Sequence, residues 1–323
     1  MIDCGLNLFL DLPVAKIAEV AQEGERLGFT KCWVYDEGLV TRDPYIALTA
    51  IALKTKRIGL GTGITNPYTR HPGITAASIA TLDELSGGRA FLGIGTGGVM
   101  TLDPLGLENQ RPLVAVREMI ETSRTLFRGE TVTYHGQTVN LSSAKIDYAR
   151  PDLEIWFAGR GPKMLAMGGE LADGVALDFV LKERLEYWVA QVCAGAARSG
   201  RPPRICYSTA IITSEATLNE VRPHMSYRLL AMPPEVRQRI GLTEADAEAI
   251  RRVMAMGGIE AAGKLVKDEW IDPFVIAGSP EECAIELKCL MSRYHMDEFL
   301  LPVLQTANAD RLMSEVAAVL ART

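Results

Sequence analysis

The stretch RIGLGTGITNPYTRHPGITAASIATLDELSGGRAFLGIG, residues 57–95, decides the fold, because it predicts a strand, a helix and a second strand in succession. An apolar run rich in glycine ends at Ile64, Pro72 opens a helix, and Gly87 ends that helix before the next apolar run. Strands that are separated by one helix pair in parallel, since the return crossover needs a helix. The stretch therefore predicts a parallel sheet with helices on its outside.

The same unit of strand and helix recurs along the chain. Apolar runs predict strands over residues 5–10, 31–35, 57–64, 89–95, 154–158, 174–177, 204–213 and 298–303. Residues 129–149 predict a hairpin insertion, and residues 215–270 predict a mostly helical insertion after the seventh strand. Eight units favour a closed α/β barrel, the (β/α)8 or TIM barrel, over an open doubly wound sheet, which usually has fewer strands. No linker of low complexity divides the chain, so we expect one domain over residues 1–323.

Composition excludes several classes of protein. The chain has 34 Lys and Arg residues against 40 Asp and Glu residues, whereas a nucleic-acid surface needs clustered positive charge. No run of eighteen apolar residues is present and the first residues do not resemble a signal peptide, so we expect a cytoplasmic protein that does not enter a membrane. The six cysteines form no C-x-x-C pair and the four histidines lie far apart, so we expect no bound metal. A small molecule is the expected substrate.

The carboxyl ends of the predicted strands are the expected place for function, because the active sites of such barrels lie there. Glycine-rich or acidic segments follow four strands: 35–38 (YDEG), 63–67 (GITNP), 95–98 (GTGG) and 159–163 (GRGPK). Glycine lets backbone N–H groups approach a flat ring or a phosphate, although ordinary tight turns explain each segment alone at least as well. Residues 159–163 precede a helix whose N-terminus attracts anions, but solvated side chains explain Arg160 and Lys163 equally well.

Three carboxylates at strand ends, Asp36, Glu37 and Asp178, are candidates for donating or orienting a proton. Each could equally cap a helix or hold a loop. Residues 93–98 look superficially like a dinucleotide-binding fingerprint, but they follow the fourth strand, and Pro104 prevents a long helix from following directly. A Rossmann-type NAD site is therefore rejected.

A family resemblance rests on three runs that match in order: 61–72, 80–89 and 93–95. Shorter matches lie at 42–45, 161–165 and 278–282. The sequence resembles the bacterial-luciferase-like superfamily of oxidoreductases, and within it the coenzyme F420-dependent methylenetetrahydromethanopterin reductase-like proteins. The resemblance covers almost the whole chain, least clearly residues 215–270.

The resemblance implies a barrel that binds a flavin-like ring at its mouth. It implies a non-prolyl cis peptide between Gly63 and Ile64, in a bulge that lies behind the ring. It also implies that the ring lies against Gly63, Ile64, Thr65, Asn66, Gly97 and Gly98, and that the cofactor phosphate binds to Gly159, Arg160, Gly161, Pro162 and Lys163. The expected cofactor is the deazaflavin F420, with FMN as the alternative.

The resemblance also favours an oxidoreductase that moves hydride between F420 and a small organic substrate, with Glu37 and Asp36 as the catalytic residues. An FMN-dependent luciferase-like monooxygenase is the alternative enzyme. A non-catalytic flavin-binding protein is the alternative of another class. Members of the family are commonly homodimers, so a homodimer is expected.

Two positions depart from the family's pattern. Asp36 is followed by Glu37, where related F420 enzymes often have histidine, and Asn7 stands where the methanopterin reductases tend to have an acidic residue. Both positions lie near the expected substrate, which Asn7 would contact. The departures weigh against tetrahydromethanopterin as the substrate and leave the cofactor class unchanged.

Overall fold

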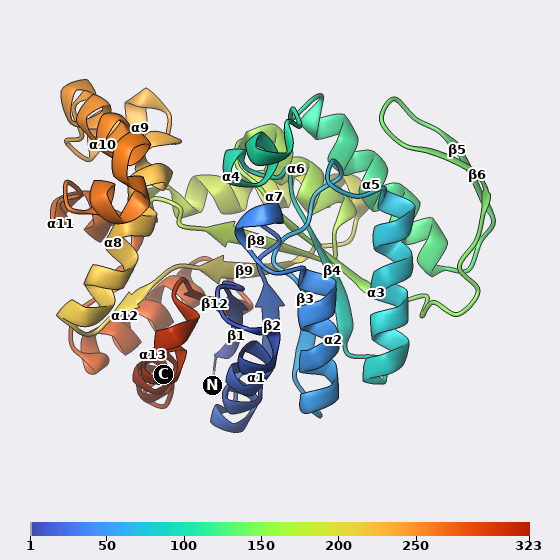
Figure 1. The fold of residues 1–323 in the computed structure, drawn as a ribbon, viewed down its shortest axis with the longest axis horizontal. Helices are drawn as coiled ribbons and strands as arrows, with labels where there is room; N and C mark the ends of the chain where they lie inside the picture. The colour runs from blue at the N-terminus through green and yellow to red at the C-terminus, as the bar shows by residue number, and fades with distance from the viewer. Residues whose placement is uncertain (1) are drawn as a thin grey trace.

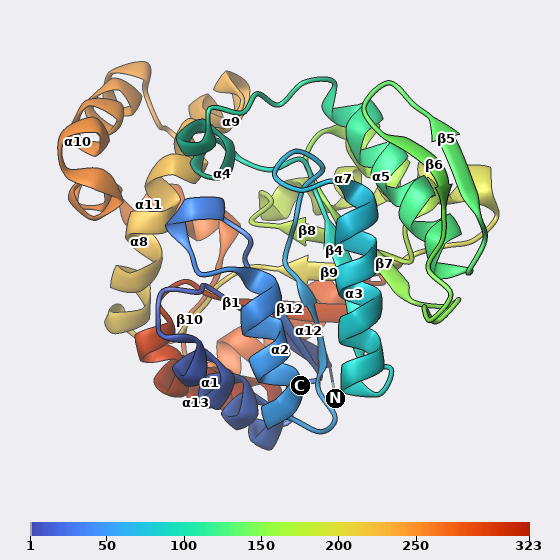
Figure 2. The same cartoon turned by 45° about the vertical axis from the view of Figure 1, so that its right-hand side comes forward.

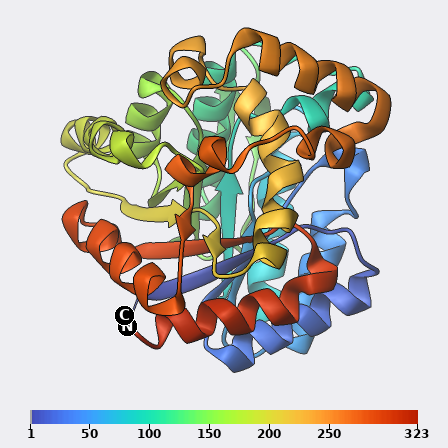
Figure 3. The same ribbon diagram turned by 90° about the vertical axis from the view of Figure 1, so that its left-hand side faces the viewer.

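Eight parallel strands close into a barrel in the computed structural model, which describes residues 2–323 (Figure 1). Around the ring they are β1 (Asp3–Leu8), β12 (Glu298–Val303), β9 (Arg204–Ser208), β8 (Gly174–Asp178), β7 (Glu154–Ala158), β4 (Ala90–Ile94), β3 (Gly59–Thr62) and β2 (Lys31–Val34). The ring closes at β1, where Leu6 pairs with Cys32 on one side and with Leu301 on the other. Figure 3 shows β12 in red beside β1 in dark blue. The predicted TIM barrel is therefore confirmed.

One predicted strand differs from the structure. Residues 204–213 form β9 and then, after a break, the short strand β10 (Ile211–Ile212), which pairs with β11 (Ile276–Ala277) outside the barrel. At the break, the Thr209 hydroxyl donates to the Phe274 carbonyl at 2.5 Å. This bond ties the chain to the segment before β11 and directs it away from the barrel. A single strand over residues 204–213 is therefore wrong.

Helices cover the outside of the barrel. They are α1 (Val14–Leu27), α2 (Pro44–Lys54), α3 (Pro72–Ser86), α5 (Pro112–Phe127), α6 (Pro162–Leu171), α7 (Leu185–Ser199), α12 (Pro280–Arg293) and α13 (Ala309–Leu320). Several begin with proline, which has no N–H to leave unpaired in the first turn. Gly28 and Gly87 end α1 and α3 in the left-handed conformation, with φ of 96° and 73°. Within residues 2–323, no helix is both long enough and apolar enough to cross a membrane.

The two insertions lie on opposite sides of the barrel (Figures 1 and 2). The predicted hairpin is confirmed as β5 (Val132–His135) and β6 (Asn140–Ala144), and the Glu118 carboxylate accepts N–H groups from its turn at residues 137–139. The predicted helical segment is also confirmed, as α8 (Glu215–Leu230), α9 (Pro234–Arg239), α10 (Glu244–Gly263) and α11 (Asp268–Ile271). These helices pack around an apolar cluster that is separate from the main core and includes Val221, Met225, Leu229, Ile250 and Trp270.

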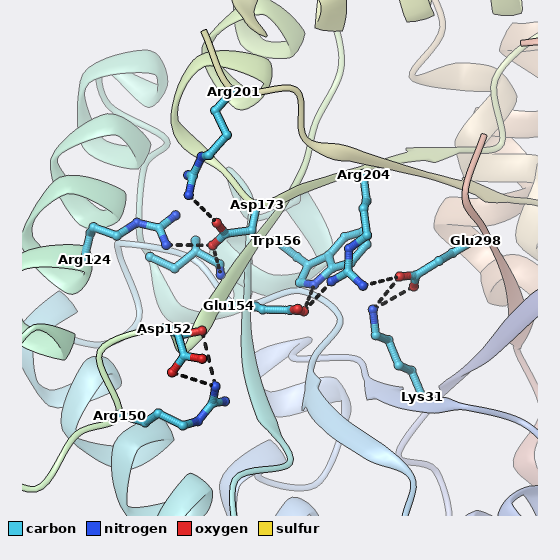
Figure 4. Close-up of polar contacts among 11 residues, drawn as sticks. Lys31, Arg124, Arg150, Asp152, Glu154, Trp156, Asp173, Arg201, Arg204 and Glu298 are labelled. Atoms are coloured by element: carbon cyan, nitrogen blue, oxygen red, sulfur yellow. Dashed lines mark hydrogen bonds and ion pairs between the residues drawn. The ribbon is translucent and has the colours of Figure 1, made fainter. Parts of the chain in front are cut away.

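An ionic network closes the N-terminal end of the barrel (Figure 4). Lys31 Nζ lies 2.7 Å from Glu298 Oε1 and 4.1 Å from the centre of the Trp156 ring. Arg204 pairs with Glu298 at 3.0 Å and with Glu154 at 2.5 Å. Because the Lys31 and Glu298 side chains are only 14% and 8% exposed, water and salt screen their attraction little. The network lies at the N-terminal end of the barrel, where residues serve stability, whereas active sites lie at the opposite end.

We expect Glu298→Gln to lower the free energy of unfolding by about 3 kcal/mol, because it leaves Lys31 buried beside a neutral partner. Urea unfolding at neutral pH measures the change. Glu130→Gln is the matched control, since Glu130 pairs with Arg128 at the exposed surface, where such pairs contribute about 0 to 1 kcal/mol. If both variants lose the same free energy of unfolding, burial does not strengthen the pair of Lys31 and Glu298.

Candidate active site

A cavity of about 940 Å³ opens at the C-terminal end of the barrel. Its wall is formed by residues at the carboxyl ends of the barrel strands, by the short helix α4 (Val99–Leu102) and by α8. Predicted site residues on this wall are Asn7, Asp36, Glu37, Gly63, Ile64, Gly97, Gly98, Gly159 and Arg160. Segments that are far apart in the sequence therefore meet around one space.

Gly63 and Ile64 form one side of the cavity, and the peptide bond between them is cis, as the resemblance implied. Asn7 Nδ2 donates to the Gly63 carbonyl at 2.9 Å, which holds this turn against β1. A Cβ at Gly63 would lie 2.6 Å from Trp33 Cβ and 2.7 Å from Asn7 Oδ1, so glycine alone fits there. Asn7 Oδ1 is buried and accepts no hydrogen bond from residues 2–323. A bare backbone wall beside an unpaired acceptor fits a flat ring with polar edges.

Gly97 and Gly98 lie at the start of α4, on the cavity wall. Gly97 has a φ of 69°, a backbone conformation that side chains with a Cβ rarely adopt. A Cβ at Gly98 would meet no atom within 4 Å, so the space beside this residue is open. The two glycines thus leave backbone accessible at the cavity, which again fits a close-lying ring.

Asp36 and Glu37 follow β2 and line the cavity. The Thr65 hydroxyl donates to Asp36 Oδ2 at 2.6 Å, and the Thr101 hydroxyl donates to Glu37 Oε2 at 2.5 Å. Burial raises the pKa of both carboxyl groups above their ordinary values, and the two hydrogen bonds oppose this shift only in part. A carboxyl group with a raised pKa keeps its proton closer to neutral pH, as a general acid requires.

Thr65 and Asn66 lie behind the cavity wall rather than on it. Thr65 is fully buried and bonds to Asp36. Asn66 is 1% exposed, and its Oδ1 accepts the N–H groups of Tyr68 and Thr69 at 2.9 and 3.0 Å. Both side chains therefore hold the loop after β3, and their contact with a cofactor ring stays a prediction.

The loop after β7 divides between the cavity and the surface. Gly159, Arg160 and also Met164 line the cavity, whereas Gly161, Pro162 and Lys163 are not part of its wall. Gly161 is the N-cap of α6, with a φ of 87°, and the side chain of Lys163 is exposed. The N-terminus of α6 therefore follows directly after the cavity wall, while Lys163 lies outside that wall, and the binding of a phosphate there stays a prediction.

The sequence interpretation missed two residues of the helical insertion. Tyr227 and Arg228 of α8 line the cavity, and Arg228 is only 4% exposed. Asp178, at the end of β8, also lines it and accepts a hydrogen bond from the Ser208 hydroxyl at 2.8 Å. A signal was present, because His224, Tyr227 and Arg228 recur at the spacing that places residues on one face of a helix.

Two kinds of similarity to known proteins agree. Residues 10–293 match the family described as luciferase-like monooxygenase. The 5,10-methylenetetrahydromethanopterin reductase of Methanolobus tindarius is 36% identical over 294 residues, which cover 89% of this chain and 90% of that protein. The enzyme of the same name from Archaeoglobus fulgidus is 33% identical, over 86% of each chain.

Solved structures show the same arrangement of elements. The coenzyme F420-dependent tetrahydromethanopterin reductase from Methanopyrus kandleri superposes with a TM-score of 0.88 and 28% identity, covering 98% of this chain and 97% of that one. An F420-dependent secondary alcohol dehydrogenase superposes with a TM-score of 0.75, covering 98% and 99% of the two chains. At 20% identity, the second similarity shows the fold alone.

Proposed function

Because the chain belongs to the luciferase-like monooxygenase family, we propose that it is an oxidoreductase that transfers hydride between F420 and a small organic substrate. The observation that carries the proposal is the cavity itself, in which a bare glycine wall with a cis peptide meets two carboxyl groups of raised pKa. Relatives named as methylenetetrahydromethanopterin reductases support the same class of reaction.

The residues of the cavity fit the cofactor in two parts. Gly63, Ile64, Gly97 and Gly98 would lie against the ring, and residues 159–163 would hold the phosphate. When bound, F420 supplies the donor or acceptor of the hydride. The remaining polar side chains of the wall are then free for the substrate.

Glu37 is the residue that we assign to proton transfer. Thr101 occupies Glu37 Oε2, which leaves Oε1 to carry the proton, and burial favours the protonated form. Asp36 lies beside it and is held by Thr65, so its carboxyl group has a fixed orientation. A homodimer, expected from the resemblance, stays a prediction that light scattering would test.

A titration of the purified protein with F420 and with FMN tests the proposed cofactor. We expect quenching of F420 fluorescence at low concentrations and much weaker binding of FMN. Tight FMN binding with weak F420 binding would replace the proposal with the FMN-dependent monooxygenase, and binding of neither would contradict the site.

Lys163→Ala is expected to weaken F420 binding by about fivefold, because an exposed lysine that faces a phosphate contributes about 1 kcal/mol. The same fluorescence titration measures the change, and the effect should shrink at high salt. Lys145→Ala, which removes an exposed lysine from a distant loop, is the control. If the two variants bind F420 equally well, the phosphate does not lie at the α6 N-terminus.

A further inference from the structure

The buried charges of this protein follow a pattern with one exception. Buried carboxylates meet several donors each, as when Glu25 accepts the N–H groups of residues 56–58, or when Asp83 and Glu298 pair with basic side chains. Among residues 2–323, Arg228 is the one arginine or lysine that is similarly buried, at 4% exposure. Unlike those carboxylates, the Arg228 guanidinium uses only one of its nitrogens for hydrogen bonds and forms no ion pair among residues 2–323.

Only one nitrogen of the Arg228 guanidinium has partners within the described chain. Nη1 donates to the His224 carbonyl at 3.1 Å and to the Tyr227 hydroxyl at 2.5 Å. Neither Nε nor Nη2 donates to any of residues 2–323, and no carboxylate oxygen of these residues lies within 4.0 Å of the guanidinium. Burial by itself lowers the pKa of Arg228, but Tyr227, Asp178 and Glu37 act on the guanidinium through space and raise that pKa overall. Neither carboxylate makes a hydrogen bond or an ion pair with the guanidinium, so Nε and Nη2 keep N–H groups that point to no residue among 2–323.

The surroundings fix the guanidinium at the cavity. Its Cζ lies 4.5 Å from the centre of the Phe179 ring and 4.9 Å from that of Tyr227, so two aromatic side chains pack against the planar group. Charged residues on the same cavity wall are Asp36, Glu37, Asp103, Glu108, Arg160 and Asp178. A planar fork with free N–H donors matches two oxygen atoms in one plane, as a carboxylate presents them.

We propose that Arg228 is a specificity-determining residue that binds a carboxylate group of the substrate through Nε and Nη2. The proposal rests on the proposed function, since it takes this cavity as the substrate site. It goes beyond that function because it names a chemical class, organic acids with a planar reducible or oxidisable group. The substrate carboxylate would accept the two donors, Nε and Nη2, that no residue among 2–323 accepts.

Calorimetric titration of the F420-loaded protein with matched ligands tests the proposal. Three pairs have the same carbon skeleton and nearly the same shape, but in the second member an NH2 group replaces the charged oxygen: acetate and acetamide, benzoate and benzamide, cinnamate and cinnamamide. We expect at least one carboxylate to bind 10- to 100-fold more tightly than its amide, the range of a charge-assisted hydrogen-bond pair. Arg228→Met should abolish this preference while leaving the affinity for the amide unchanged.

Two further variants keep the test decisive. Arg228→Lys retains the positive charge but has no planar guanidinium. We expect the logarithm of the ratio of carboxylate to amide affinity to fall to roughly half of its wild-type value. Arg252→Met removes an exposed arginine from α10 and should keep the full preference. If Arg228→Met fails to fold, the lysine variant decides the matter, and a preference equal to that of the wild type overturns the proposal.

Other outcomes separate recognition from alternative roles. No preference for any carboxylate in the wild type overturns the proposal, as does an equal loss of carboxylate and amide affinity in Arg228→Met. A purely structural role would change the melting temperature of Arg228→Met and leave the ratio of carboxylate to amide affinity at its wild-type value, whereas we expect that ratio to fall to about one. F420 affinity, measured in the same samples, reports separately on the proposed function. If F420 does not bind, the same pairs are titrated into the protein alone.

Discussion

Glu37→Gln should lower kcat by about 100-fold or more while the affinity for F420 stays at its wild-type value, because the amide keeps the shape of the side chain but has no proton to transfer. The measurement is the change in F420 absorbance during turnover, with a substrate found by screening enones, imines and alcohols. A loss confined to KM would instead assign Glu37 to substrate binding. Unchanged turnover would remove Glu37 from the reaction.

The same variant has a stability signature whose sign can be worked out. Burial raises the pKa of Glu37 above its ordinary value of 4.5, so the folded protein holds this proton more tightly than the unfolded chain does. That stabilisation is fully present below the unfolded pKa and is lost as the pH rises through the folded pKa. Glutamine does not titrate. Glu37→Gln should therefore gain stability relative to the wild type as the pH rises above 4.5. If the free energies of unfolding of the two proteins differ by the same amount at every pH, the raised pKa is contradicted.

Gly93→Ala should lower the free energy of unfolding by about 4 kcal/mol and distort the cavity floor. A Cβ at Gly93 would lie 1.9 Å from the Thr62 carbonyl oxygen, which belongs to the backbone and cannot turn away. The Gly93 N–H donates to Thr62 Oγ1 at 3.1 Å, and its carbonyl accepts the Thr65 N–H at 2.9 Å. Any shift that relieves the clash also moves Thr65, and with it the hydrogen bond to Asp36.

Urea unfolding and F420 titration of Gly93→Ala measure both effects. For the urea measurement alone, Gly98→Ala is the control, because a Cβ there meets no atom within 4 Å and its φ of −109° is open to any residue. It does not serve as a control for F420 binding, since Gly98 is proposed to lie against the ring. We expect a change below about 0.5 kcal/mol for the control. Similar stability of the two variants would mean that β3 and β4 can separate without cost.

The barrel could be predicted from the sequence because local and global signals agree. Proline marks the starts of helices and glycine marks their ends. The order of strands and helices therefore follows from these boundary residues and the apolar runs between them. The break after β9 could not be predicted, since Ala210 and Ile211 continue the apolar run without a turn signal. What breaks the strand is a contact with Phe274, which is distant in sequence.

The candidate site was only partly predictable, for a different reason. Strand ends bring Asp36, Glu37 and Gly63 together in any such barrel, so their common location follows from topology. The family resemblance marks Thr65 as a site residue but does not give the direction of its side chain, which points to Asp36. Arg228 lies on a helix that buries charged and polar side chains beside apolar ones, so no apolar period marks the buried face.

The separate apolar cluster of α8 to α11 has an evolutionary consequence. The glycines proposed for the cofactor belong to barrel loops. Arg228 belongs to α8, whose apolar side chains pack with those of the other inserted helices and with loop residues such as Phe179 and Leu304, apart from the main core. Substitutions on α8, where Tyr227, Arg228 and Ala231 line the wall, can change the pocket without altering the main barrel core or the ionic network at its far end. Proteins that evolve from such a chain can therefore change their substrate while they keep the same cofactor.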